Sequence, residues 1–279
     1  MNDTTHGAHG LKRRAFIAST AIAGMGVGMG IGMGTVAHAQ VLDLNDAINK
    51  AGRQRMLSQR ASKAYLALAQ NVESRNAQQV LDKSVSLFER QLGELKSFAP
   101  SAAIRATYDA LDGAWGEFKR ELTGLNPGKA EAAKVVKLDA AVLALANQGT
   151  TQYEAASGKP VGKLVNIAGR QRMLSQRMAK FCLASAMQID PAGSTAEIGK
   201  SRTEFLAALE VLRNAPEATA AIRQELVLAD AQWIFFNRGL QRLDGAGASA
   251  SLMSDVFVSS ENLLAIMDRV TGLYAEIKS

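Results

Sequence analysis

The sequence contains very little histidine and cysteine, and this scarcity excludes most common catalytic and metal sites. All three histidines, His6, His9 and His38, lie near the start of the chain, so the sequence after His38 has none. A Ser-His-Asp or Cys-His catalytic set is therefore excluded there, as is any zinc or iron site that uses imidazole. We expect a non-enzymatic protein with no catalytic residues, no cofactor and no metal site.

Cysteine, proline and excess charge are also scarce. Cys182 is the single cysteine, so no disulfide can form within the chain, and we expect its thiol to fill a core position. The formal net charge is +6, and it falls to +4 when residues 1–39 are left out. This balance is too weakly basic to indicate a nucleic-acid partner.

Residues 1–39 have the composition of an export signal. The segment LKRRAFIAS places Arg13 and Arg14 before a weakly apolar, glycine-rich run, and AHA at 37–39 offers small side chains to a signal peptidase. This pattern resembles a twin-arginine signal peptide. We expect cleavage after Ala39 and a periplasmic protein, with an uncleaved leader that anchors the chain to the inner membrane as the alternative. No later segment reaches the roughly 18 apolar residues that a membrane span needs.

The rest of the sequence has the pattern of helices. Ala, Leu, Glu, Gln, Lys and Arg dominate, apolar residues recur at spacings of three and four, and no strand-like alternation is present. The five prolines lie between the periodic segments, where proline starts or stops a helix. We expect helices at residues 41–70, 77–98, 101–124, 129–157, 161–188, 195–213, 217–242 and 249–278.

The sequence is internally repeated. The segment AGRQRMLSQR occurs at 51–60 and, without change, at 168–177. Further matches at offsets of 117 to 121 residues pair Phe88 with Phe205, Trp115 with Trp233 and Tyr153 with Tyr274. We expect these aromatic residues in the core. The repeat predicts an all-α fold with two tandem antiparallel four-helix bundle modules, residues 40–158 and 159–279.

On a helix, the repeated segment forms a polar strip. In the first copy the strip lies between Arg55 and Arg60 and contains Asn45, Asn49, Gly52, Met56, Gln59 and Lys63, and in the second it lies between Arg172 and Arg177 and contains Asn166, Gly169, Met173, Gln176 and Lys180. The buried stripe of a bundle favours Leu, Ile and Val, so we do not expect these residues at core positions. The two glycines would let another backbone approach closely.

The repeated segment carries three arginines and no acidic residue. The charges of Arg53, Arg55 and Arg60 are therefore not neutralised within the segment. Either carboxylates of neighbouring helices pair with these arginines, or the arginines bind an external anion. Arg55 continues the apolar seam that contains Ile48, which directs it toward a packing surface and favours an anion.

The sequences INKAGRQRMLSQR and VNIAGRQRMLSQR resemble the signature of the PilJ-type domain of type IV pilus methyl-accepting chemotaxis transducers. They are also similar to the P-box of NarX nitrate/nitrite sensors. The resemblance implies periplasmic four-helix sensor modules in which paired first helices of two subunits hold one nitrate. With the polar strip, it implies the ligand-binding residues Asn49, Gly52, Arg55, Met56, Arg60, Asn166, Gly169, Arg172, Met173 and Arg177.

Two functional hypotheses follow. The chain is a sensor or binding protein that captures a small oxyanion, nitrate or nitrite, and presents it to a membrane sensor or chemoreceptor. Alternatively, it is an interaction module that docks on a pilus- or chemotaxis-related receptor without a small ligand. A bend at Gly158, Pro160 and Gly162 favours motif helices that approach each other within one chain. Pairing of each motif with its own copy in a homodimer is the competing arrangement.

Overall fold

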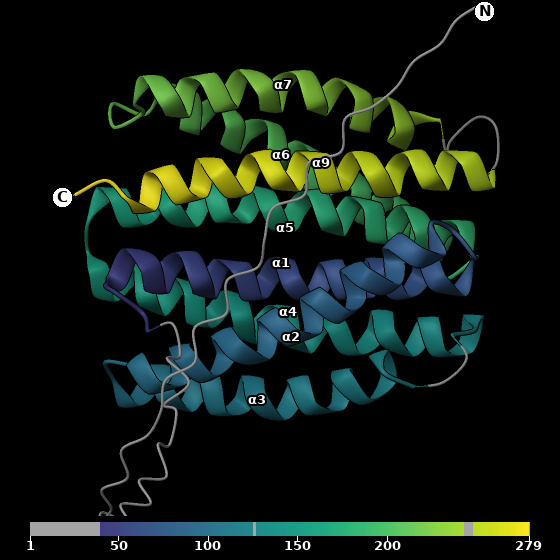
Figure 1. Ribbon diagram of the computed structural model, residues 1–279, viewed down its shortest axis with the longest axis horizontal. Helices are drawn as coiled ribbons and strands as arrows, with labels where there is room; N and C mark the ends of the chain where they lie inside the picture. The colour runs from purple at the N-terminus through teal and green to yellow at the C-terminus, as the bar shows by residue number, and fades with distance from the viewer. Residues whose placement is uncertain (1–39, 125–126, 243–247, 279) are drawn as a thin grey trace, which may run out of the picture. The chain divides into compact units, whose positions relative to one another are not determined.

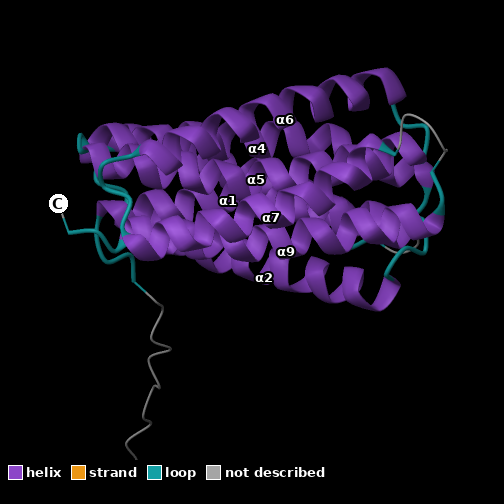
Figure 2. Cartoon of the chain, turned by 90° about the horizontal axis from the view of Figure 1, so that it is seen from above, coloured by secondary structure: helices purple, strands orange, loops and turns teal. Residues whose placement is uncertain are grey.

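The computed structural model describes residues 40–124, 127–242 and 248–278, and these residues form helices and no strand (Figures 1 and 2). The helices are α1 (Leu44–Ala69), α2 (Ser74–Phe98), α3 (Ala102–Leu122), α4 (Lys129–Ser157), α5 (Pro160–Ala186), α6 (Pro191–Asn214), α7 (Ala220–Gln241) and α9 (Ala250–Ala275). The predicted all-α fold is confirmed. The export signal expected at 1–39 lies outside the described residues.

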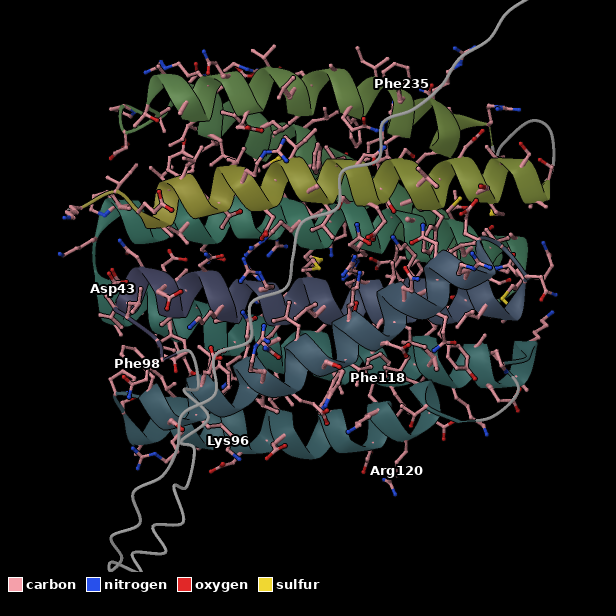
Figure 3. All side chains as sticks on the ribbon, viewed as in Figure 1. Asp43, Lys96, Phe98, Phe118, Arg120 and Phe235 are labelled. Atoms are coloured by element: carbon pink, nitrogen blue, oxygen red, sulfur yellow. The ribbon has the colours of Figure 1, made fainter. Side chains whose placement is uncertain are left out.

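Local sequence sets the helix ends. Five helices begin after a cap whose side chain accepts a hydrogen bond from a backbone N–H three residues later, namely Asp43, Ser101, Asp190, Thr219 and Ser249. Asp43 is labelled at the start of α1 in Figure 3. Pro160 and Pro191 occupy the first position of α5 and α6, where a missing backbone N–H costs no hydrogen bond.

The helices form two modules with matching contacts, α1 to α4 and α5 to α9. The first helix of each module packs against the second and the last, and the third packs against the last (Figure 1). Phe88 stacks on Trp115, and the equivalent Phe205 stacks on Trp233. All four rings are buried, as predicted, and so is Cys182. The internal repeat therefore extends to individual ring contacts in the two cores.

The modules meet along α1 and α5, which run parallel. Gly158 has a φ of 61°, which reverses the chain between α4 and α5. A β-carbon on Gly162 would lie 3.0 Å from Cδ1 of Ile48, near the start of both helices. Near their ends, Gln70 donates a hydrogen bond to the carbonyl of Leu183 at 3.2 Å. The expected approach of the two motif helices within one chain is confirmed.

Helices α1 and α5 are buried on nearly all sides because each packs against its own module and against the other motif helix. The polar strip consequently lies inside the protein: Gln59 and Lys63 are fully buried, as are Gln176 and most of Lys180. The expectation that these residues avoid core positions is wrong. They are tolerated because partners on α4 and α9 accept their hydrogen bonds.

Helix α7 has apolar residues on both sides. Trp233 and Phe236 face the core, whereas Val227, Leu228, Ile234 and Phe235 are exposed on the opposite side. Phe235 is labelled on α7 in Figure 3. At an offset of 118 residues, the first module has Asp109, Ala110, Gly116 and Glu117 instead. We call these four exposed residues of the second module the α7 face.

None of the helices within 40–124, 127–242 and 248–278 combines the length and apolar character that crossing a lipid bilayer requires.

Candidate functional site

The repeated motifs meet where Gly52 of α1 faces Gly169 of α5. A β-carbon on Gly52 would lie 3.8 Å from the Cα of Gly169. The same position is 3.2 Å from Nη2 of Arg55 and 3.5 Å from Nη2 of Arg172. A β-carbon on Gly169 would likewise lie 3.2 Å and 3.7 Å from Nη2 of Arg172 and Arg55. The two glycines therefore leave room in which a pair of guanidinium groups converges.

Each arginine is held by the asparagine of the other motif. Nη2 of Arg55 donates to Oδ1 and the backbone carbonyl of Asn166, at 2.7 and 3.3 Å. Arg172 donates reciprocally to Oδ1 and the carbonyl of Asn49, both at 3.0 Å. Helical side chains lean toward the N-terminus, which explains why each arginine reaches the asparagine one turn before its facing glycine. These contacts fix the two guanidinium groups.

The two guanidinium groups are buried and only partly satisfied. Arg55 is 1% exposed and Arg172 is fully buried, and the Nε atom of each has no acceptor within the described residues. Burial, followed by the positive charges of Arg170 and Arg172, lowers the pKa of Arg55 to about 9. Burial also lowers the pKa of Arg172, to about 10. Both groups remain charged at neutral pH, with buried N–H donors directed into the protein.

The two arginines differ in charge compensation. Nη1 of Arg172 contacts the carboxylate of Asp268 on α9. Nη1 of Arg55 instead contacts the neutral amide oxygen of Asn147 on α4, at 3.0 Å. Among the described residues, no carboxylate contacts Arg55. Burying a positive charge without such a partner costs free energy.

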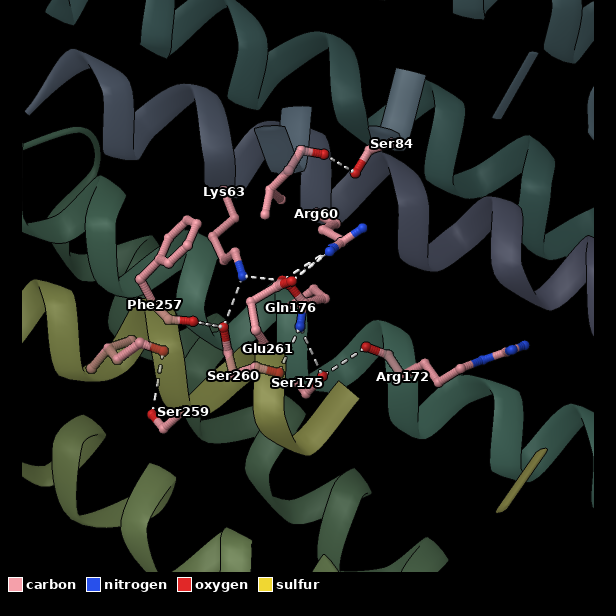
Figure 4. A network of polar contacts seen from close by, with 12 residues as sticks. Arg60, Lys63, Ser84, Arg172, Ser175, Gln176, Phe257, Ser259, Ser260 and Glu261 are labelled. Carbon is pink, nitrogen blue, oxygen red and sulfur yellow. Dashed lines mark hydrogen bonds and ion pairs between the residues drawn. The ribbon is translucent and has the colours of Figure 1, made fainter. Parts of the chain in front are cut away.

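Most of the other basic residues of the motif helices pair with carboxylates. Lys63 and Arg60 share Glu261 on α9, and Lys63 also donates to Ser260 at 2.9 Å (Figure 4). Lys180 contacts the buried Asp139 at 2.6 Å. Further ion pairs of these two helices join Lys50 with Asp46 and Glu94, Arg53 with Asp268, Arg170 with Glu204, and Arg177 with Glu197. Carboxylates of neighbouring helices therefore neutralise most of these cations. This is one of the two alternatives that the sequence left open.

The structure brings together part of the predicted ligand-binding set. Asn49, Gly52 and Arg55 meet Asn166, Gly169 and Arg172 where Gly52 faces Gly169. We call this place the glycine crossing. Arg60 and Arg177 do not reach it, because Glu261 and Glu197 hold their guanidinium groups elsewhere. Met56 and Met173 are buried, and neither lies among the atoms nearest the two glycines. We accordingly restrict the candidate site to the six residues at the crossing.

Sequence reasoning missed the partners on α4 and α9. The offset of 121 residues that pairs Tyr153 with Tyr274 also pairs Asn147 with Asp268. Comparing the polar residues at this offset would have revealed that one module has an amide where the other has a carboxylate. The paired tyrosines make equivalent contacts, because each hydroxyl donates to a backbone carbonyl, of Leu95 or Leu212, at 2.8 Å.

Among the residues that the structure describes, no group of three or more His, Cys, Asp or Glu side chains is placed to hold a metal ion. The crossing offers hydrogen-bond donation from paired groups that are charged at neutral pH, which suits a small anion.

Comparison with known protein families assigns the duplicated helical modules to a class of sensory domains. The family of type IV pili methyl-accepting chemotaxis transducer N-terminal domains matches residues 37–157 and again residues 153–242. The chain belongs to this family. Its domains are periplasmic sensor regions of membrane transducers and are in general not enzymes. Searches of curated proteins and of solved structures gave no match.

Proposed function

We propose that this protein is a periplasmic binding and sensor protein that holds one small oxyanion between Arg55 and Arg172. The observation that carries the proposal is the pair of buried guanidinium groups at the Gly52–Gly169 crossing, one of which has no carboxylate in contact. An external anion would accept hydrogen bonds from the unpaired Nε donors and reduce the repulsion between the two cations.

A small oxyanion suits the crossing better than a larger ligand. The two Nη2 atoms both lie within 3.5 Å of the position that a β-carbon on Gly52 would take, so the space between them is narrow. Nitrate and nitrite are compact, and their oxygens can accept paired hydrogen bonds from a guanidinium fork. Burial lowers the local dielectric constant and strengthens these contacts relative to those at a surface.

Thermal unfolding with and without added anions tests the proposal. A ligand that binds only the folded state raises the free energy of unfolding by about 2.7 kcal/mol at a hundredfold excess over its dissociation constant. We expect nitrate or nitrite to raise the melting temperature of the wild-type protein. The Arg55→Gln/Arg172→Gln variant should lose this shift and keep its helical circular dichroism.

The matched control is Arg60→Gln/Arg177→Gln, which removes the same number of charges from the same two helices. Because Arg60 and Arg177 are held by Glu261 and Glu197, this variant should keep the anion-induced shift. A wild-type protein whose melting temperature responds to no oxyanion, or an equal shift in the Arg55→Gln/Arg172→Gln variant, would refute the proposal.

We also propose that the chain reaches the periplasm through a twin-arginine signal and is cleaved after Ala39. The paired Arg13 and Arg14 and the AHA segment support this, together with the periplasmic location of the family's domains. The intact mass of protein recovered from the periplasm tests it. Loss of residues 1–39 is the expected result, and a mass that includes them would instead indicate a chain tethered to the inner membrane.

The α7 face favours a second candidate function, docking on a membrane receptor. Leu228 and Phe235 of this face, with the exposed Ala231 between them, have spacings of three and four, the spacing of a seam that pairs with another helix. Arg238 is exposed beside this seam, which suits a partner helix with an acidic residue beside its apolar stripe. A receptor that the wild type binds and that Leu228→Glu/Phe235→Glu does not bind would support docking. Equal binding by both proteins would exclude this face.

A further inference from the structure

The two arginines at the glycine crossing are equivalent in the repeat but have neighbours of different charge. Asn147 and Asp268 occupy matching positions on α4 and α9. Asn147 accepts a hydrogen bond from Nη1 of Arg55, and Asp268 accepts one from Nη1 of Arg172. The site therefore has a neutral amide on one side and a carboxylate at the same point on the other.

Other charged groups near the crossing do not remove this difference. Arg53 also donates to Asp268, at 2.9 Å, from a position nearer to solvent. Glu154 attracts Arg55 electrostatically, but its carboxylate accepts a hydrogen bond from the Asn166 amide and does not contact Arg55. Arg170 adds positive charge near Arg55, and its own guanidinium group is bound to Glu204. Arg55 remains the cation whose contacts are all neutral.

We infer that the difference between Asn147 and Asp268 sets the charge selectivity of the anion site, which takes a single monovalent oxyanion that binds chiefly to Arg55. This inference rests on the proposed function. Asp268 already balances part of the positive charge on Arg172, so an anion with one negative charge is enough to balance the charge that remains on the two arginines. A divalent anion would bring its second negative charge toward the Asp268 carboxylate, which repels it.

The selectivity can be measured with two anions of the same shape and different charge. Perchlorate and sulfate are both tetrahedral, and they carry one and two negative charges. By titration calorimetry we expect the wild type to bind nitrate and perchlorate more tightly than sulfate. Asp268→Asn should raise the affinity for sulfate relative to perchlorate by about tenfold, because it removes one repulsive charge.

Exchanging the two side chains tests the same inference from the other direction. Asn147→Asp places a carboxylate against Arg55 and should weaken nitrate binding about tenfold or more. The double variant Asn147→Asp/Asp268→Asn moves the amide to the Arg172 side and should restore the affinity to within about threefold of wild type. The matched neutral variant Asn147→Ala adds no charge, so it should bind nitrate more tightly than Asn147→Asp.

The outcomes separate this inference from the proposed function. If the wild type binds none of the three anions, both fail. If the wild type binds nitrate but Asn147→Asp binds it equally well, the site stands and the charge-selectivity inference is wrong. The inference is also wrong if sulfate binds the wild type as tightly as perchlorate, or if the double variant binds nitrate no better than Asn147→Asp.

Discussion

At the scale of the residue, the facing glycines determine whether there is space between the two arginines. A β-carbon on Gly52 would lie 3.2 Å from Nη2 of Arg55, closer than ordinary van der Waals contact, and the atom it meets ends a flexible side chain. The guanidinium group of Arg55 would have to shift from its Asn166 contacts, so such a change should disturb ligand contacts more than the fold. Alanine is the better helix former, so the proposed site gives a reason for glycine at this position.

We expect Gly52→Ala to weaken oxyanion binding about tenfold while the free energy of unfolding without ligand changes by less than about 1 kcal/mol. Chemical denaturation and titration calorimetry would measure the two quantities. The control is Gly116→Ala on α3, where a β-carbon would meet no atom within 4 Å. That variant should leave binding unchanged, and a Gly52→Ala protein with wild-type affinity would show that the crossing does not contact the anion.

The carboxylates on α9 give a second prediction at this scale. Burial would raise the pKa of Glu261, but Lys63 and Arg60 outweigh it and hold this pKa down at about 2, against an ordinary value of 4.5. Between these values the unfolded chain binds more protons than the folded one. The stability that Glu261 contributes is therefore complete above pH 4.5 and is lost as the pH falls toward 2.

Equilibrium unfolding at a series of acidic pH values checks this dependence. Glu261→Gln should make the free energy of unfolding fall less steeply with decreasing pH than it does in the wild type. Glu117→Gln, on the exposed side of α3, should follow the wild-type slope. A Glu261→Gln protein with the wild-type slope would mean that the Lys63 and Arg60 contacts do not form in solution.

At the scale of the element, the turn between α4 and α5 places the two motif helices side by side. Gly158 is a helix C-cap with a φ of 61°, and no atom lies within 4 Å of where its β-carbon would be. A side chain at this position would not clash with other atoms, but the left-handed backbone conformation would be strained. Gly158→Ala should therefore destabilise the fold by about 1 kcal/mol.

Denaturant unfolding measures the free energy of unfolding of Gly158→Ala, and Gly93→Ala is the matched control variant. Gly93 lies inside α2 with no atom within 4 Å of its β-carbon position, so alanine there should stabilise the protein by up to about 1 kcal/mol. Opposite signs for the two variants are the expected result. A stabilising Gly158→Ala change would show that this turn does not adopt its left-handed conformation in solution.

The helices were largely predictable from the sequence, whereas the partners of the site residues were not. Periodicity and proline positions located every described helix, with ends that differ by a few residues, as for α6, which begins at Pro191 rather than 195. The approach of the two motif helices was expected from the bend after residue 157, and a close backbone approach was expected at the two glycines, but their direct juxtaposition was not. The burial of Lys63 and Gln59 was missed because a helix surrounded on all sides has no solvent face, which a single-helix pattern does not show. Asn147 and Asp268 were missed because side-chain partners on distant helices depend on packing.

At the scale of the whole molecule, the two modules are joined through their most buried helices. Lys63 of the first module contacts Glu261 of the second, and Lys180 of the second contacts Asp139 of the first. These pairs cross the boundary between the modules; Lys63, Lys180 and Asp139 are buried and Glu261 is partly buried. Unfolding one module would leave charged partners of the other without compensation, which is costly. The two modules should therefore unfold together.

Each module contains one tryptophan, which allows the prediction to be tested directly. Trp115 reports on the first module and Trp233 on the second. In Trp115→Phe and Trp233→Phe proteins, fluorescence and far-ultraviolet circular dichroism should give the same unfolding midpoint within each variant. A fluorescence midpoint that departs from the circular dichroism midpoint would indicate that the modules unfold independently.

The central claim is that one chain forms one anion site from its two motif copies, and the stoichiometry of nitrate binding tests it most directly. Titration calorimetry of the purified protein, combined with sedimentation to establish its oligomeric state, should give one nitrate per chain, and Arg55→Gln should abolish the heat of binding. A stoichiometry of one nitrate per two chains in a dimer would point to a site shared between subunits. The account would be contradicted if the wild type gave no heat of binding, or if Arg55→Gln bound nitrate with the same heat and affinity as the wild type.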